Sequence, residues 1–172
     1  MAIPGRNASP VDILRPKRTF FVTSKTSMGR RLLQTERNAG LLIEILRELV
    51  KEHAFELHDF VVMPDHVHLL VTIGEGMTIE KAIQLVKGRF SFRLKKEHGY
   101  LGEVWQRGFS EVQVMGPQNF ETHRRYIAEN PVKAGLVQAG EEYPFCYRHL
   151  AREKAQANAI AAELAEQGLK PG

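Results

Sequence analysis

The stretch Phe55-Glu-Leu-His-Asp-Phe-Val-Val-Met-Pro-Asp-His-Val-His-Leu-Leu-Val-Thr-Ile73 holds two β-rich runs separated by Pro64 and Asp65. Proline presets its own φ angle and aspartate bonds to nearby backbone, so this pair favours a tight turn. Two strands joined so closely must pair antiparallel. The stretch therefore predicts a hairpin made of Phe55–Met63 and His66–Ile73.

Periodic segments on both sides of this hairpin predict the rest of the fold. A β-prone run, Arg18–Ser24, precedes it, and Glu111–Met115 alternates like a strand after it. Helical spacing predicts three helices: one capped by Thr35, one from about Thr78 to Glu97, and one from near Asn119 that stops before Pro131. The order β-α-β-β-α-β, followed by a helix, is the split β-α-β arrangement. We expect an α+β, ferredoxin-like fold with an antiparallel sheet, helices on one face and an extra C-terminal helix.

Length and composition bound the class of protein. The chain has 172 residues, enough for one domain with a sizeable core, and its 24 Lys and Arg against 20 Asp and Glu give a net charge of +4. Because no apolar run approaches the roughly 18 residues of a membrane span, we expect no membrane association. The single cysteine, Cys146, excludes a disulfide framework and a Cys-rich zinc module.

The ends of the chain differ in composition from its middle. We expect a flexible leader over residues 1–15, one folded domain over residues 16–150 and a weakly helical tail over residues 151–172. The first residues carry no apolar core of a secretory signal, so we expect a cytoplasmic protein, nucleoid-associated when it is bound to DNA.

His66 and His68 are the first candidates for chemistry. Side chains two apart on a strand share a face, so both imidazoles project together while Val67 points to the other side. Two neutral imidazoles at that separation can chelate one divalent metal ion. A hydrogen-bonded surface pair is the alternative.

Tyr126 and Asn130 lie four residues apart on the third predicted helix, and His123 precedes the tyrosine by three, so the three share a face. The tyrosine is a candidate nucleophile, and the amide oxygen of Asn130 could complete a metal site begun by the histidines. The alternative is a packed tyrosine ring and an asparagine that ends the helix.

Cations cluster on the second predicted helix and beyond it. Arg89, Arg93 and Lys96 flank its apolar stripe with no acid between Lys81 and Lys96, as binding to DNA phosphates requires; a solvated helix face is the alternative. Trp105 could stack on an unpaired base, but we expect a core anchor; Arg107 could contact a phosphate or a guanine edge, and a purely structural role is equally open. The full set of candidate DNA-binding residues is Lys87, Arg89, Arg93, Lys96, Arg107, Arg124 and Arg125.

Three blocks in series resemble one known family. FVVMPDHVHLL begins at Phe60, VWQRGF begins at Val104 and YIAENPVKAGLV begins at Tyr126. Together they resemble the REP-associated tyrosine transposases, a group within the HUH single-tyrosine transposases, over roughly residues 15–150.

The resemblance implies a function and roles for site residues. His66 and His68 would be paired metal ligands for Mg²⁺ or Mn²⁺, Asn130 a third ligand and Tyr126 the nucleophile, carried by the extra helix. The implied reaction is cleavage and transfer of single-stranded DNA next to hairpins through a 5′-phosphotyrosine link, without a nucleotide cofactor. We expect a monomer rather than a dimer. A domesticated protein of the same fold that binds structured DNA or RNA without cutting it, and a hydrolytic phosphoesterase, are the alternatives.

Overall fold

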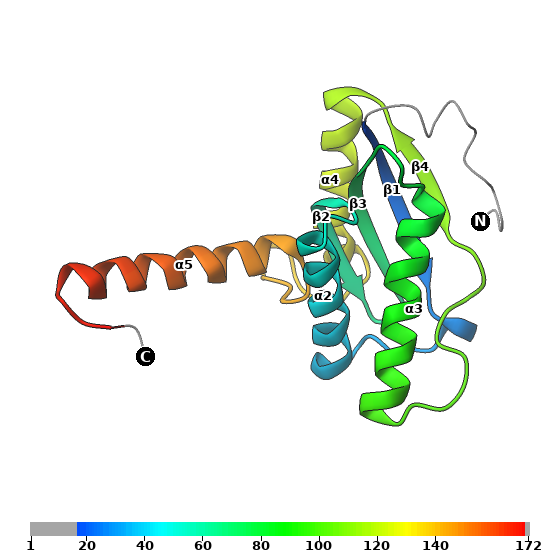
Figure 1. Cartoon of the computed structure of the whole chain (residues 1–172), viewed down its shortest axis with the longest axis horizontal. Helices are drawn as coiled ribbons and strands as arrows, with labels where there is room; N and C mark the ends of the chain where they lie inside the picture. The colour runs from blue at the N-terminus through cyan, green and yellow to red at the C-terminus, as the bar shows by residue number, and fades with distance from the viewer. Residues whose placement is uncertain (1–16, 171–172) are drawn as a thin grey trace.

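The computed structural model describes residues 17–170. The predicted leader, 1–15, lies outside them. Four strands, β1 (Lys17–Lys25), β2 (Glu56–Met63), β3 (His66–Gly74) and β4 (Ser110–Val114), form one sheet in the order β2-β3-β1-β4. All neighbouring strands pair antiparallel, and β2 and β3 form the predicted hairpin. The mixed ferredoxin-like fold expected from the sequence is confirmed (Figure 1).

Two helices cover one face of the sheet. These are α2 (Glu36–Lys51) and α3 (Ile79–His98), and the side chains of Thr35 and Thr78 cap their first turns. Their apolar stripes pack on the strand residues that face them, among them Val22, Val67 and Leu69. A short 3-10 turn, η1 (Ser27–Gly29), follows β1.

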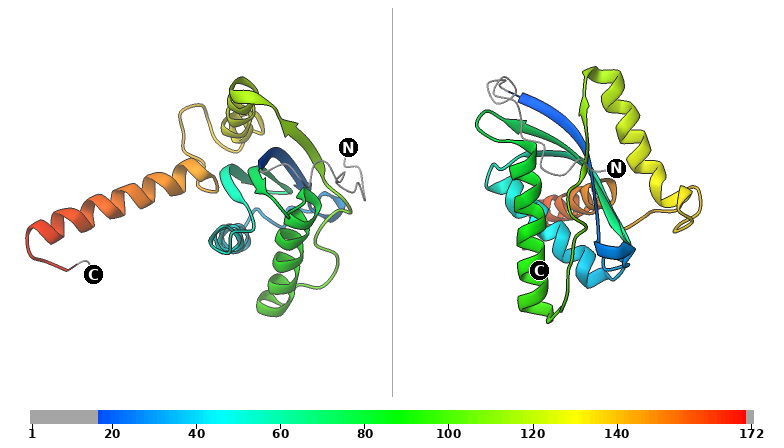
Figure 2. Two further views of the ribbon diagram at one scale, coloured as in Figure 1. Left: turned by 45° about the horizontal axis from the view of Figure 1, so that its top comes forward. Right: turned by 90° about the vertical axis from the view of Figure 1, so that its right-hand side faces the viewer.

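A third helix, α4 (Gly116–Lys133), covers the opposite face (Figure 2). Ile127 is buried there in a second apolar cluster with Val61, Met63 and Leu70. Strand alternation places His66 and His68 on this same face, because Val67 and Leu69 belong to the other core.

The prediction that this helix stops before Pro131 is wrong. The helix continues to Lys133, and Pro131 is buried inside it. Inside a helix proline removes the hydrogen bond that its own amide would have donated, and its ring crowds the carbonyl four residues earlier. The last turn is closed without that bond, because the Ala134 amide donates to Asn130 and the Leu136 amide donates to Pro131.

The last helix, α5 (Tyr147–Glu166), projects from the body and comprises most of the segment expected to be a tail (Figure 1). The segment before it pairs with the outer edge of β2, through a bridge between Val61 and Cys146 and a hydrogen bond from the Val62 amide to Phe145. Among the described residues no helix combines the length and apolarity needed to span a bilayer.

Candidate active site

The two histidines of β3 converge on one point. Their Nε2 atoms lie 3.2 Å apart. The opposite ring nitrogens are both held: Nδ1 of His66 lies 2.6 Å from a carboxylate oxygen of Asp65, and Nδ1 of His68 lies 2.8 Å from the hydroxyl oxygen of Thr23. Partners on Nδ1 orient an imidazole and aim its Nε2. The turn residue Asp65 and the neighbouring strand thus fix both rings.

Burial keeps His68 neutral. Its side chain is buried, and desolvation, followed by the nearby His66 and Lys25, lowers the pKa of His68 to about 3. A protonated imidazole has no lone pair to offer a metal, so a neutral ring is the form that a ligand requires.

This donor set fits a divalent cation. Two ligands at right angles around an octahedral ion with bonds of about 2.1 Å lie about 3 Å apart, close to the spacing of the two Nε2 atoms. Residues 17–170 contain no group of three His, Cys, Asp or Glu side chains arranged to hold one metal ion. A side-chain amide is another group that can supply an oxygen ligand.

Tyr126 meets this pair within one chain. Its ring packs edge-on against the ring of His68, with centroids 5.4 Å apart. Phe21 of β1 stands between the two elements, because its ring contacts those of His68, His123 and Tyr126. Tyr126 is 42% exposed, so the residue can be reached from solvent.

A cavity of about 590 Å³ brings these residues together, within the usual range for ligand sites. His66, His68 and Tyr126 line it, and they come from β3 and α4. The rest of the wall comes from β1, the turn after it, the turn between β2 and β3, the segment leading into β4 and the start of β4: Thr23, Lys25, Thr26, Gly29, Asp65, Gln106 and Ser110.

Asn130 and His123 do not line the cavity with Tyr126. Asn130 is half-buried one turn beyond Tyr126 and is absent from the cavity lining; its role as a ligand remains a prediction. His123 donates from Nδ1 to the Asn119 carbonyl at 2.8 Å and packs on Phe21. We assign His123 to the support of the helix, the role that the sequence left open.

Comparison with known families identifies the family of the chain. The model of the family described as "Transposase IS200 like" matches residues 22–130, which include both histidines and the tyrosine. The chain belongs to this family. It is 28% identical over 136 residues to the REP-associated tyrosine transposase of Escherichia coli K12, covering 76% of this chain and 75% of the relative. The resemblance seen in the three sequence blocks is confirmed.

Solved structures agree. The structure of a REP-associated tyrosine transposase bound to a REP hairpin matches with a TM-score of 0.65 and 26% identity, covering 89% of this chain and 84% of the other. A crystal structure of a Deinococcus radiodurans R1 protein assigned to the transposases shares the fold, with a TM-score of 0.51 and 21% identity over 73% of this chain and 96% of the other.

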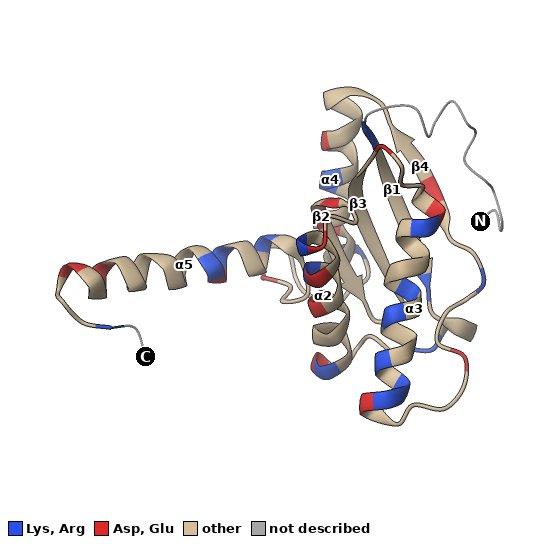
Figure 3. Ribbon diagram, in the orientation of Figure 1, with Lys and Arg blue, Asp and Glu red and all other residues tan. Residues whose placement is uncertain are grey.

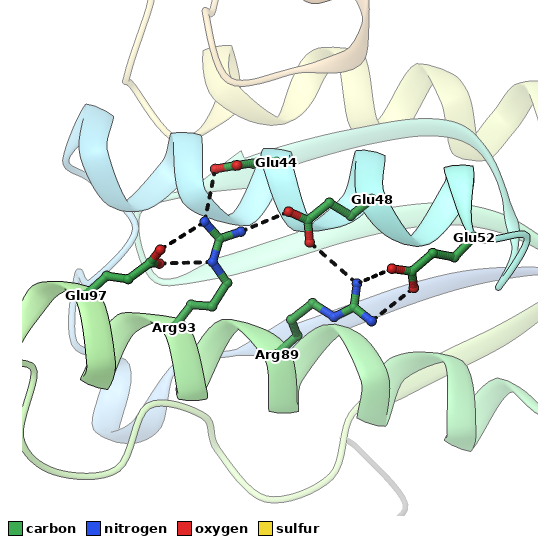
Figure 4. Close-up of polar contacts among 6 residues, drawn as sticks. All are labelled: Glu44, Glu48, Glu52, Arg89, Arg93 and Glu97. Carbon is green, nitrogen blue, oxygen red and sulfur yellow. Dashed lines mark hydrogen bonds and ion pairs between the residues drawn. The ribbon is translucent and has the colours of Figure 1, made fainter.

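The basic helix of this IS200-like transposase differs from the sequence expectation. Figure 3 shows basic bands along α3 and acidic bands on the neighbouring α2. The prediction that Arg89 and Arg93 carry uncompensated charge is wrong. Figure 4 shows both guanidiniums turned toward carboxylates, and these belong to Glu44, Glu48, Glu52 and Glu97. Local sequence around α3 does not reveal three of these acids, because Glu44, Glu48 and Glu52 lie on α2 and at its C-terminal end.

Lys87 also has partners within the protein. Its ammonium donates to the carbonyls of Gln106 at 2.9 Å and Gly108 at 2.8 Å, and burial lowers the pKa of Lys87. The indole of Trp105 donates to the Lys87 carbonyl and packs on Phe90, as expected for a core anchor. These contacts hold the segment that presents Gln106 and Ser110 to the cavity.

The remaining candidate cations are more open. Lys96, Arg107 and Arg125 are exposed, and Lys96 lies over the ring of Phe92. Arg124 is half-buried, 3.7 Å from the buried carboxylate of Asp59 and 3.5 Å from Glu121. Contact of any of these with DNA stays a prediction.

Sequence reasoning did not predict seven residues of the cavity wall: Thr23, Lys25, Thr26, Gly29, Asp65, Gln106 and Ser110. Only strand register could have found the first two: Thr23 pairs with His68 and Lys25 with His66 across β1 and β3. Because register is a property of two distant segments, no local pattern reveals it.

Proposed function

We propose that this IS200-like transposase cleaves and rejoins single-stranded DNA beside hairpins, with Tyr126 as the nucleophile. The observation that carries the proposal is the contact between the Tyr126 and His68 rings at the wall of one cavity. A relative whose structure is bound to a REP hairpin supports hairpin DNA as the substrate.

The cation site would be formed by His66 and His68, with Asn130 as a third ligand. Mg²⁺ or Mn²⁺ bound there would polarise the phosphate oxygens and stabilise developing negative charge. The protein's own part is to hold both Nε2 atoms toward the cavity and to keep His68 neutral, through Asp65, Thr23 and burial.

The covalent step needs no nucleotide cofactor. The phenol of Tyr126 releases its proton to solvent, and its oxygen forms a bond to phosphorus as the bond from phosphorus to the 3′-oxygen breaks; the departing 3′-oxygen takes up a proton from solvent. The phosphotyrosine link conserves the energy of the broken strand, so a later 3′-hydroxyl can displace the tyrosine and reseal DNA. Because the phenol and the histidines meet in one chain, we infer that a monomer suffices.

The test uses the full chain, a labelled oligonucleotide with a hairpin and a single-stranded flank, and Mn²⁺. We expect a denaturant-resistant protein–DNA adduct, which Tyr126→Phe abolishes while leaving hairpin affinity largely intact. His66→Ala with His68→Ala should also remove the adduct and weaken Mn²⁺ binding measured by calorimetry.

The control is Tyr147→Phe, a change at an exposed tyrosine outside this cavity, which should leave the adduct unchanged. An adduct that survives Tyr126→Phe would refute the assignment of the nucleophile. Tight hairpin binding without any adduct from the unaltered protein would support the non-cleaving alternative.

A further inference from the structure

Lys25 is the one Lys or Arg that lines the catalytic cavity, as far as residues 17–170 are concerned. Neither the sequence motifs nor the comparisons assign it a role. Phosphoryl transfer places negative charge on the oxygens around phosphorus, and a fixed cation beside them stabilises the transition state. A lone ammonium at this wall therefore needs an explanation.

Strand geometry aims Lys25 at the site. It is the last residue of β1 and stands opposite His66 in the register with β3. Side chains alternate along a strand, so Lys25 shares a face with Thr23 and Phe21, both of which contact His68. Its backbone carbonyl accepts a hydrogen bond from the Gln106 amide at 2.8 Å, which fixes the strand end against the opposite wall.

The charge of Lys25 is uncommitted. Lys17, at the other end of the same strand, pairs with Glu56 at 2.8 Å, and Lys133, which lies over the Tyr126 ring, pairs with Glu129 at 3.2 Å. Lys25 forms no ion pair within the described part of the chain. Lys25 is exposed and lines the cavity, so its ammonium can bind an anion that enters there.

We propose that the ammonium of Lys25 binds a non-bridging oxygen of the scissile phosphate while Tyr126 attacks phosphorus. This inference rests on the proposed function and extends it. The ammonium gives up no proton in the step: it contributes charge to the pentacoordinate transition state, and the departing 3′-oxygen takes its proton from solvent. Lys25 thereby acts as a catalytic residue.

The first measurement is the single-turnover rate of adduct formation at saturating hairpin DNA. We expect Lys25→Met to lower this rate by about 100-fold, the usual effect of removing one donor to a developing oxyanion. Lys25→Arg, which keeps the charge, should stay within about tenfold of the unaltered protein. Lys17→Met is the matched control, since it removes a lysine from the far end of the same strand, and should leave the rate unchanged.

The second measurement separates this inference from the proposed function. In Tyr126→Phe protein, which cannot form the adduct, Lys25→Met should reduce the slope of log affinity against log salt by about 0.7, as loss of one phosphate contact to a single strand does. If the unaltered protein forms no adduct but this slope falls, the proposed function fails and the phosphate contact by Lys25 stands.

Two results would overturn the inference. One is a salt slope that Lys25→Met leaves unchanged. The other is an equal loss of rate in Lys25→Met and Lys25→Arg together with a lowered melting temperature in both, which would mean that Lys25 only supports the fold.

Discussion

Replacing both Arg89 and Arg93 by methionine tests whether these two residues of α3 bind DNA or form ion pairs within the protein. Methionine keeps much of the length of the arginine stem and removes the charge. Arg89 forms two hydrogen bonds of 3.0 Å to Glu52, and Arg93 contacts Glu97 at 2.9 Å and Glu48 at 3.1 Å.

The carboxylate partners determine the expected change in the salt dependence of DNA binding. Two cations stand among four carboxylates, including Glu44, so the group of six carries a net charge of −2 and does not attract phosphate. If both guanidiniums nevertheless contacted a single strand, their loss would reduce the salt slope by about 1.4, at about 0.7 per contact. Between 50 and 200 mM salt this would change the ratio of the two affinities by about sevenfold. We expect a change close to zero.

Folding stability should respond instead. Removing both arginines leaves four like charges along α2 and the end of α3, so the melting temperature should fall, and added salt should recover part of the loss by screening the repulsion. The assay is fluorescence anisotropy of labelled hairpin DNA at several salt concentrations, paired with thermal denaturation of the same samples.

Arg107→Met is the matched comparison, because Arg107 is exposed next to the cavity residue Gln106. If it contacts phosphate, its loss reduces the slope by about 0.7 while leaving the melting temperature unchanged. A slope change of about 1.4 in the double variant would refute the reasoning from the ion pairs.

Two further predictions concern titration. In chelator-treated protein, NMR should show that the ring of His68 stays neutral until the pH approaches 3. Because the pKa of His68 in the folded protein lies below the ordinary 6.5, the stability that depends on its neutral ring is full above pH 6.5 and is lost as the pH falls toward 3. Titration of this ring near pH 6.5 would contradict its burial. Burial also raises the pKa of the Cys146 thiol, so less thiolate forms at a given pH. Alkylation of Cys146 by iodoacetamide at pH 8 should therefore be much slower in the native protein than in the urea-unfolded protein. Equal alkylation rates would contradict the burial of this thiol.

Local pattern determined much of this protein. Turn chemistry at Pro64 and Asp65 defined the hairpin, and the two-residue period of a strand placed His66 and His68 on one face. Thr35 marked a helix start because its hydroxyl satisfies an amide that the helix cannot. These features depend on neighbours in sequence, which is why the sequence alone reveals them.

Tertiary structure decided where charges and the nucleophile meet their partners. The sequence predicted that Arg93 was unpaired, but the packing of α2 on α3 places Glu44 and Glu48 beside it. Both acids lie more than 40 residues from Arg93 in the chain. Lys25 and Tyr126 reach the same cavity only because β1 pairs with β3 and α4 packs across the opposite face from α2 and α3. Side-chain periodicity gives the face of an element, whereas the partner of that face depends on sheet register and helix packing, which the whole core fixes together.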